Sequence, residues 1–337
     1  MSTQAQVERL DHLGVIAGVI KDLKLVEFID NRIPSDARET ISCGEAVAGM
    51  IINGLGFSDR PLTLTPQFFE NKALENLFRP GVKAESFNRF KLGRVLDDCH
   101  TYGCDLLFAE ASAQICKQEA VDTKFNSLDT TAFALTGEYD VDSDEHTIEI
   151  THGYSKDHRP DLKQAVLEIM CSHDGGIPVI SKAWNGNASD TKIFRERAKA
   201  LASSFKAAEG PRYLIADSKL YDAKTIEEGL GLIPFITRIP GTIKLENTTI
   251  ESALQKPLEE WALLDEKHRF RSFNLKHNDL QQRWIVVYSE ERQNKAEKTV
   301  SAMCKKEREK IEKTLKKLCA EEFSCPHDAK RALKRLF

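Results

Sequence analysis

The sequence predicts a protein of the α/β (α+β) class, in which an all-helical N-terminal domain precedes a mixed sheet with helices. Two observations predict this class. Apolar residues recur at helical spacing near the N-terminus, for example at Val7, Leu10 and Leu13. From about Asp122 the pattern changes to short apolar runs typical of strands, which alternate with helical stretches.

The first predicted domain, residues 1–120, is a packed set of helices. Helical spacing continues at Met50, Ile51 and Leu55, and a last amphipathic helix is predicted over residues 86–120. A bundle with no site of its own and a domain that binds DNA ends both remain open for this part of the chain.

The second predicted domain, residues 121–240, contains the mixed sheet. Strands are predicted at 126–135, 163–171, 178–184, 212–217 and 234–237, and helices at about 190–208 and 222–231. Ser189 or Asp190 is predicted to cap the first of these helices.

The third predicted region, residues 241–337, contains one clear strand at 283–288 and a long basic helix from about Arg292 to Ala320. Residues 291–337 carry 14 Lys/Arg against 8 Asp/Glu, although the whole chain has a net charge of −4. A basic terminal segment suits a phosphate backbone. A solvated helix face is the alternative interpretation.

Composition favours a soluble globular protein of about two domains, with 41% hydrophobic and 30% charged residues. No apolar run approaches the length of a membrane span, and no secretory signal is recognisable. The eight cysteines form no Cys-x-x-Cys pair, which argues against a zinc site or a disulfide framework. A cytoplasmic protein is expected.

Two aspartates close strand-like runs: Asp129 follows Ser127-Leu128, and Asp217 follows the run 213–216. Between them lies the polar, cationic segment 154–164. Mg²⁺ prefers hard oxygen ligands and is usually bound by one or two carboxylates together with substrate phosphates. The pattern therefore predicts a divalent-metal site that handles phosphate. Taken singly, each aspartate could instead cap a turn at a strand end.

These segments resemble the motifs of bacterial insertion-sequence DDE transposases of the IS-four type, whose catalytic core has an RNase H-like fold. The resemblance covers roughly residues 10–290 and is carried by 44–48, 53–57, 91–97, 128–131, 154–164, 186–190 and 215–219. It implies an RNase H-like core in which the first and fourth strands lie side by side. Asp129 and Asp217 would then meet across 88 positions of sequence.

The resemblance also implies an activity: DNA cleavage and strand transfer at the ends of an insertion sequence, dependent on Mg²⁺ (or Mn²⁺). A complete site holds two ions, of which Asp129 would bridge both and Asp217 would hold one. The implied partners are the terminal inverted repeats and target DNA, and the implied assembly is a homodimer in a synaptic complex. No membrane partner is expected.

Five polar residues of the intervening segment are candidates for contact with DNA: Tyr154, Lys156, His158, Arg159 and Lys163. Arginine binds phosphate oxygens in pairs and lysine acts as a point charge. A solvated charged turn that leads into the second strand is the alternative.

The third carboxylate of the DDE motif is not recognisable. The family places Tyr, Arg, Glu and Lys on one helix, with two, three and six residues between them. The nearest run is Tyr288, Arg292, Glu297 and Lys305, in which each interval is one residue longer. A slip of one residue turns a helical side chain by about 100°. We therefore expect a C-terminally truncated chain that does not carry out strand transfer alone.

Two other classes of protein remain open. The first is a non-catalytic, truncated transposase that binds DNA and acts as a regulator. The second is a different RNase H-like nuclease, against which the helical N-terminal domain argues.

Overall fold

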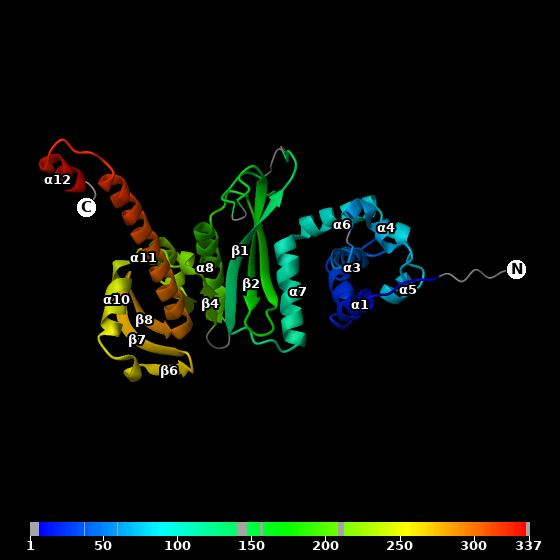
Figure 1. Cartoon of the computed structure of the whole chain (residues 1–337). Coiled ribbons are helices and arrows are strands. Elements are labelled where there is room, and N and C mark those ends of the chain that lie inside the picture. Colours follow the sequence, from blue (N-terminus) through cyan, green and yellow to red (C-terminus); the bar gives the residue numbers. More distant parts are fainter. Residues whose placement is uncertain are drawn as a thin grey trace. The chain divides into compact units, whose positions relative to one another are not determined.

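The computed structural model describes residues 7–36, 38–58, 60–139, 147–155, 158–207 and 212–334. Contacts between residues divide the chain into two compact units, Met1–Arg238 and Ile239–Phe337 (Figure 1). The first unit contains helices followed by a five-stranded mixed sheet, and the second contains a three-stranded sheet. The predicted mixed α/β class is confirmed.

The N-terminal part of the first unit is helical, as predicted. Its α-helices are α1 (Leu13–Asp22), α2 (Leu25–Asp30), α3 (Cys43–Gly54), α4 (Thr65–Phe69), α5 (Leu74–Leu77), α6 (Arg89–Tyr102) and α7 (Cys104–Gln118). Short 3₁₀ turns lie at Leu62–Leu64 and Ala84–Phe87. One hydrophobic core joins these helices, and its largest fully buried members include Phe69 and Phe87.

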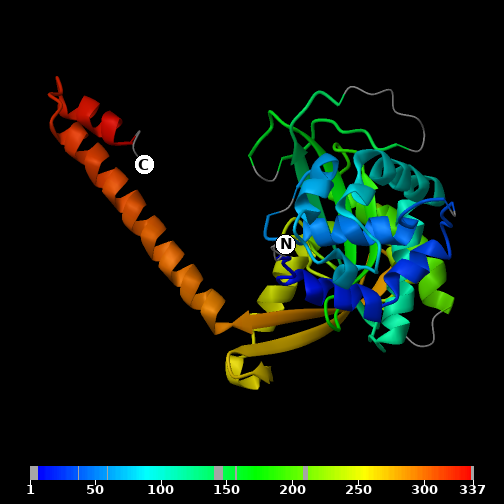
Figure 2. The same cartoon turned by 90° about the vertical axis from the view of Figure 1, so that its right-hand side faces the viewer.

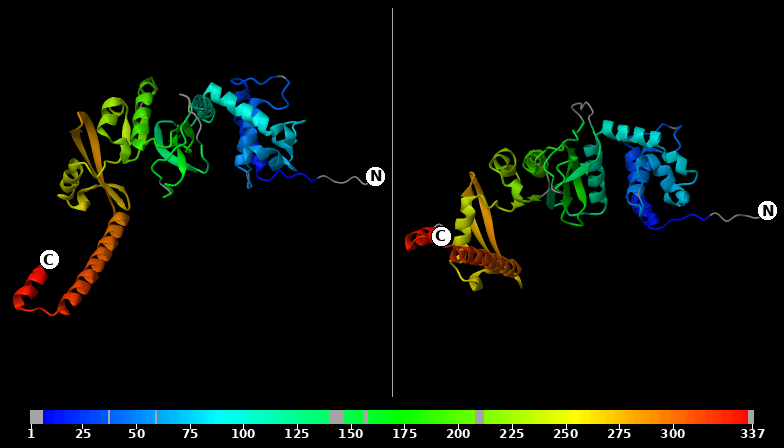
Figure 3. Two further views of the ribbon diagram at one scale, coloured as in Figure 1. Left: turned by 90° about the horizontal axis from the view of Figure 1, so that it is seen from above. Right: turned by 45° about the horizontal axis from the view of Figure 1, so that its top comes forward.

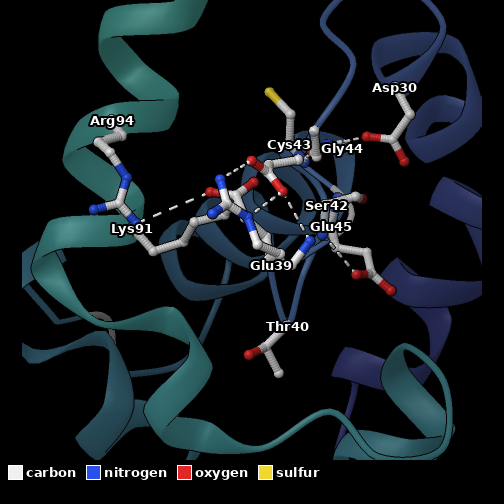
Figure 4. A network of polar contacts seen from close by, with 12 residues as sticks. Asp30, Glu39, Thr40, Ser42, Cys43, Gly44, Glu45, Lys91 and Arg94 are labelled. Carbon is white, nitrogen blue, oxygen red and sulfur yellow. Dashed lines mark hydrogen bonds and ion pairs between the residues drawn. The ribbon is translucent and has the colours of Figure 1, made fainter.

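Helix α3 begins in a network of polar contacts (Figure 4). The Ser42 hydroxyl accepts from the Glu45 backbone, and the Glu45 carboxylate accepts from the Ser42 backbone, which forms a capping box. The guanidinium of Arg79 donates to the same carboxylate, at 2.6 and 3.0 Å. The buried Lys91 ammonium pairs with Glu39 at 2.5 Å, which ties α6 to the segment before α3. This network fixes α3 within the helical core.

The helix predicted over residues 86–120 is wrong in one respect: it is two helices. Gly103 separates α6 from α7 and has a φ of +103°. L-residues with a side chain rarely adopt positive φ, whereas glycine does so without steric cost. Asn88 caps the start of α6, because its side-chain oxygen accepts from the backbone of Phe90 and Lys91.

The sheet follows the predicted order of elements. Its strands are β1 (Phe125–Leu135), β2 (Lys163–Ser172), β3 (Pro178–Trp184), β4 (Tyr213–Ala216) and β5 (Phe235–Thr237), in the spatial order β3-β2-β1-β4-β5. Helix α8 (Asp190–Ala207) follows β3, and α9 (Ala223–Glu228) follows β4. Pairing is antiparallel among β1, β2 and β3 and parallel along β1, β4 and β5. The first and fourth strands therefore lie side by side.

A buried ion pair attaches α8 to the sheet. Glu168 of β2 has no exposed surface and accepts from Arg197 of α8 and from the indole of Trp184 on β3. A buried carboxylate needs such partners, because an unpaired charge in the interior is costly. On β1, Asn126, Leu128 and the other alternate residues share this buried face, and Asp129 lies on the opposite face.

The second unit contains more strand structure than the sequence predicted. Besides the predicted strand, seen as β8 (Leu280–Ser289), it contains β6 (Ala262–Asp265) and β7 (His268–His277) (Figure 3). Strands β7 and β8 form a hairpin that turns at Asn278 and Asp279, both of which have positive φ. Positive φ at both central residues is the geometry of a type I′ turn, which this Asn-Asp pair accommodates.

Helices flank the three-stranded sheet in the chain. Helix α10 (Lys244–Leu254) precedes it, and the long helix α11 (Glu290–Cys319) continues from β8, close to the predicted bounds. After α11 the chain turns back to α12 (Pro326–Lys334) (Figure 2). Among the described residues, no helix is both long and apolar enough to cross a membrane.

Candidate functional site

The register of two parallel strands aligns the two predicted aspartates. Strands β1 and β4 pair Phe125 with Tyr213 and Ser127 with Ile215, so that partners are 88 positions apart. Continuing this register by two residues sets Asp129 opposite Asp217. Neighbouring strands lie about 4.8 Å apart, which is close enough for two carboxylates to reach one ion.

Both carboxylates are available for a ligand. Asp129 and Asp217 are exposed. The Asp129 carboxylate accepts from the backbone of Thr130 at 2.7 Å, and the Asp217 carboxylate accepts from the backbone of Lys219 at 2.9 Å. Within the described ranges, neither carboxylate forms an ion pair, whereas the nearby Asp190 does. The two strand-end aspartates thus keep oxygen atoms free of cationic partners.

A third aspartate lies beside this pair and fastens its supports together. Asp190, the first residue of α8, accepts from the Thr130 hydroxyl at 2.6 Å and from the Lys219 ammonium. Its side chain is only 12% exposed. The contacts join α8 to residues adjacent to Asp129 and Asp217 in the sequence. The sequence indicated only a helix cap here; Ser189 caps α8 through a 3.4 Å bond from Lys192.

Lys219 is held away from the aspartate that it follows. Its bond to Asp190 raises the pKa of Lys219, and the nearby charges of Asp190, Asp217 and Tyr154 act in the same direction. The ammonium therefore stays charged and engaged with Asp190. Without that partner, the nearest carboxylate in the sequence would be Asp217, one of the two predicted metal ligands.

The segment that leads to Tyr154 is packed closely against β2. Gln164, almost fully buried, donates from its side chain to the carbonyl of Gly186 at 2.7 Å and to that of Tyr154 at 3.4 Å. A Cβ on Gly153 would lie 2.0 Å from the Gly186 carbonyl oxygen, so only glycine permits this approach. The Tyr154 side chain remains 83% exposed.

The predicted cationic candidates differ in their partners. Arg159 donates to both carboxylate oxygens of Asp161, at 2.9 and 2.7 Å, and this contact raises the pKa of Arg159. The Lys163 ammonium donates to the carbonyl of Glu138. His158 is exposed and has a positive φ of 57°. Lys156 lies outside the described residues. In this arrangement Asp161 competes with a phosphate for Arg159.

The donor set fits a divalent cation only in part. Carboxylate oxygens are the ligands that Mg²⁺ and Mn²⁺ accept. Among the residues that the structure describes, however, no group of three or more His, Cys, Asp or Glu side chains is placed to hold a metal. Asp129 and Asp217 could therefore supply two ligands to one ion, with the remaining positions left to water or to substrate oxygens.

We predict that Asp190→Asn weakens binding of a divalent ion about tenfold. The amide still accepts from Thr130, but it loses the charge-assisted bond to Lys219, which is then available to Asp217. Titration with Mn²⁺ measures this change. Adding Lys219→Gln should restore the affinity, because the competing cation is removed. Unchanged affinity in the single variant would contradict the role given to Asp190.

Comparisons with known proteins give a partial picture. A family model described as "Domain of unknown function (DUF4277)" matches residues 5–113, the helical part of the first unit. The curated proteins contain no match. Among solved structures, piggyBac transposase in a synaptic complex with hairpin DNA is similar, with 10% identity and a TM-score of 0.38. The match covers 82% of this chain and 60% of that one, so the chain spans less than two thirds of that transposase.

Proposed function

We propose that this chain is a DNA transposase of the DDE type that acts on the ends of a mobile element. The observation that supports it most is the register of β1 and β4, which aligns Asp129 with Asp217 at one edge of a mixed sheet. Two aspartates aligned on adjacent strands, beside a polar, cationic segment, suit phosphoryl transfer on a nucleic-acid backbone. The sequence resemblance to IS-four-type transposases supports the same function.

The two aspartates are proposed to bind Mg²⁺ or Mn²⁺. Such an ion would polarise a phosphate oxygen and favour deprotonation of the attacking hydroxyl or water. Asp190 acts indirectly, since it holds Lys219 away from Asp217. Tyr154, Lys156, His158, Arg159 and Lys163 are proposed to contact the DNA backbone. For Arg159, DNA binding then requires that phosphate replace Asp161.

The third carboxylate has no candidate with suitable spacing. Tyr288 lies in β8, while Glu297 lies in α11 and accepts from Gln293 at 2.9 Å. The displaced run is therefore divided between a strand and a helix, whereas the family motif occupies one helix. We propose that the described residues supply the DNA- and metal-binding part of a transposase site, and that the chain works as a homodimer.

The test uses duplexes that carry the inverted repeats flanking the gene. We expect the purified chain to bind these ends more tightly than random duplexes of the same length. We expect no strand transfer with Mg²⁺ or Mn²⁺, because paired-ion stabilisation needs a further carboxylate. Equal binding to ends and random duplexes would contradict the proposed function. Strand transfer abolished by Glu297→Gln would show that the displaced run is functional.

A regulator that occupies the same ends without cutting them is the second candidate. The missing group of three metal ligands among the described residues favours it. The two candidates differ when a C-terminal helix with the Tyr-Arg-Glu-Lys spacing is added in cis. Strand transfer by that fusion would support a transposase, and continued inactivity would support the regulator.

A further inference from the structure

Helix α11 carries a row of lysines on one side. Lys306, Lys310, Lys313 and Lys317 follow one another at intervals of four, three and four residues. At 100° per residue these positions fall within a sector of about 60°, and the row extends about 16 Å along the helix. We call these four residues the lysine row. No glutamate of α11 falls inside its sector.

The side chains of the row are exposed and largely uncommitted. All four residues are exposed, and α11 has no buried residue along its 30 positions. In the described part of the chain, the row forms one ion pair, between Lys310 and Glu307 at 3.6 Å, in which both side chains are more than 60% exposed. Such exposed pairs contribute little to stability and can be exchanged for another anion.

The row also lines a hollow along the helix. The hollow has a volume of about 940 Å³, and its lining includes all four lysines of the row together with Lys316, Glu307 and Glu309. Five ammonium groups against two carboxylates give this surface a positive field, which attracts polyanions.

We propose that the lysine row binds the phosphate backbone of duplex DNA without regard to base sequence. Lysine is a compact point charge that suits phosphate contact, and backbone contacts supply most of the affinity for non-specific DNA. The proposal rests on the proposed function, which makes DNA the substrate, and it adds a second surface, in the other unit of the chain, to the strand-end site.

The composition of α11 argues for DNA rather than an anionic membrane. A helix that lies on a membrane needs a broad apolar face with bulky residues such as Trp, Phe and Leu. Helix α11 contains no aromatic residue, and Glu307 interrupts its exposed apolar positions Val300, Met303 and Ile311. Burying that face in lipid would bury a carboxylate with it.

The experiment compares two variants with the same change in net charge. The row variant is K306Q/K310Q/K313Q/K317Q. The control variant is K298Q/K305Q/R308Q/K316Q, which removes four positive charges from other sides of the same helix. Glutamine keeps a long side chain and a good helix propensity. Circular dichroism confirms that both variants keep their helices.

Affinity for a random 30-base-pair duplex is measured across a range of salt concentrations in the full chain. Each lost phosphate contact lowers the slope of log K against log salt by about 0.9. We expect the row variant to lose about 3 units of slope and the control variant less than 1. Equal losses in both variants, or none in either, would overturn the proposal, as would loss of binding to phosphatidylserine vesicles with DNA binding unchanged.

The outcome is separable from that of the proposed function. Preference of the wild-type chain for its ends over random duplexes tests the proposed function, and neither variant is needed for that comparison. The difference in salt slope between the row and control variants tests the lysine row. A chain with no preference for ends could still show this difference, and a chain that prefers its ends could lack it.

Discussion

Arg197→Met is expected to destabilise the first unit by about 3–5 kcal/mol, because it leaves a buried carboxylate without its cation. Glu168 is fully buried, and Arg197 is its cationic partner, with a side chain that is 13% exposed. The Trp184 indole at 2.8 Å would remain, but one neutral donor does not offset a buried charge. Urea unfolding followed by tryptophan fluorescence and circular dichroism measures the loss.

The double variant Glu168→Gln/Arg197→Met is the matched control. The neutral amide can still accept from Trp184, and the methionine keeps much of the packing volume. Replacing both members of a buried pair with neutral groups is often close to neutral in stability. We therefore expect the double variant to be more stable than Arg197→Met. If the two unfold at the same urea concentration, the charge is not the cause.

Gly186→Ala is expected to cost about 2–3 kcal/mol and to loosen the segment that leads to Tyr154. A Cβ at this position would lie 2.0 Å from the carbonyl oxygen of Gln164 and 2.5 Å from that of Thr151. Both atoms belong to backbone, so the strand end must move to relieve the overlap. Hydrogen exchange of the Gln164 amide, which donates to Thr151 at 2.9 Å, should accelerate.

Gly18→Ala provides a control of opposite sign. Gly18 lies inside α1, and no atom lies within 4 Å of the Cβ that alanine would add. Alanine in a helix interior is favoured over glycine by roughly 0.5–1 kcal/mol. A gain in stability at Gly18 together with a loss at Gly186 would show that close backbone approach, not glycine replacement itself, is responsible. A stable Gly186→Ala variant with unchanged exchange would contradict the close packing.

The sequence was sufficient to predict elements whose signal is local and periodic. The strands that contain Asp129 and Asp217, and helix α11, lie close to their predicted bounds. The break at Gly103 was missed because the apolar spacing continues across it, and only the positive φ reveals the turn. Strand β7 was missed although the Asn278-Asp279 pair suits a two-residue hairpin turn, because its charged alternate residues hide the strand pattern.

The site was predictable in its carboxylates but not in its supports. Strand ends with aspartates are visible in the sequence, whereas the contact of Asp190 with Thr130 and Lys219 depends on the packing of α8 near the sheet edge. The ion pair between Arg159 and Asp161 is separated by only two residues and could have been considered. The buried pair of Glu168 and Arg197 joins residues 29 positions apart and has no local signal.

The most direct test of the central claim, that Asp129 and Asp217 share a divalent ion, is Mn²⁺ binding followed by electron paramagnetic resonance. The wild-type chain, Asp129→Asn, Asp217→Asn and the control Asp161→Asn are titrated side by side; Asp161 is an exposed aspartate paired with Arg159. We predict one site of highest affinity in the wild type and in Asp161→Asn, and its loss in both other variants. A site that survives either Asp129→Asn or Asp217→Asn would contradict the claim.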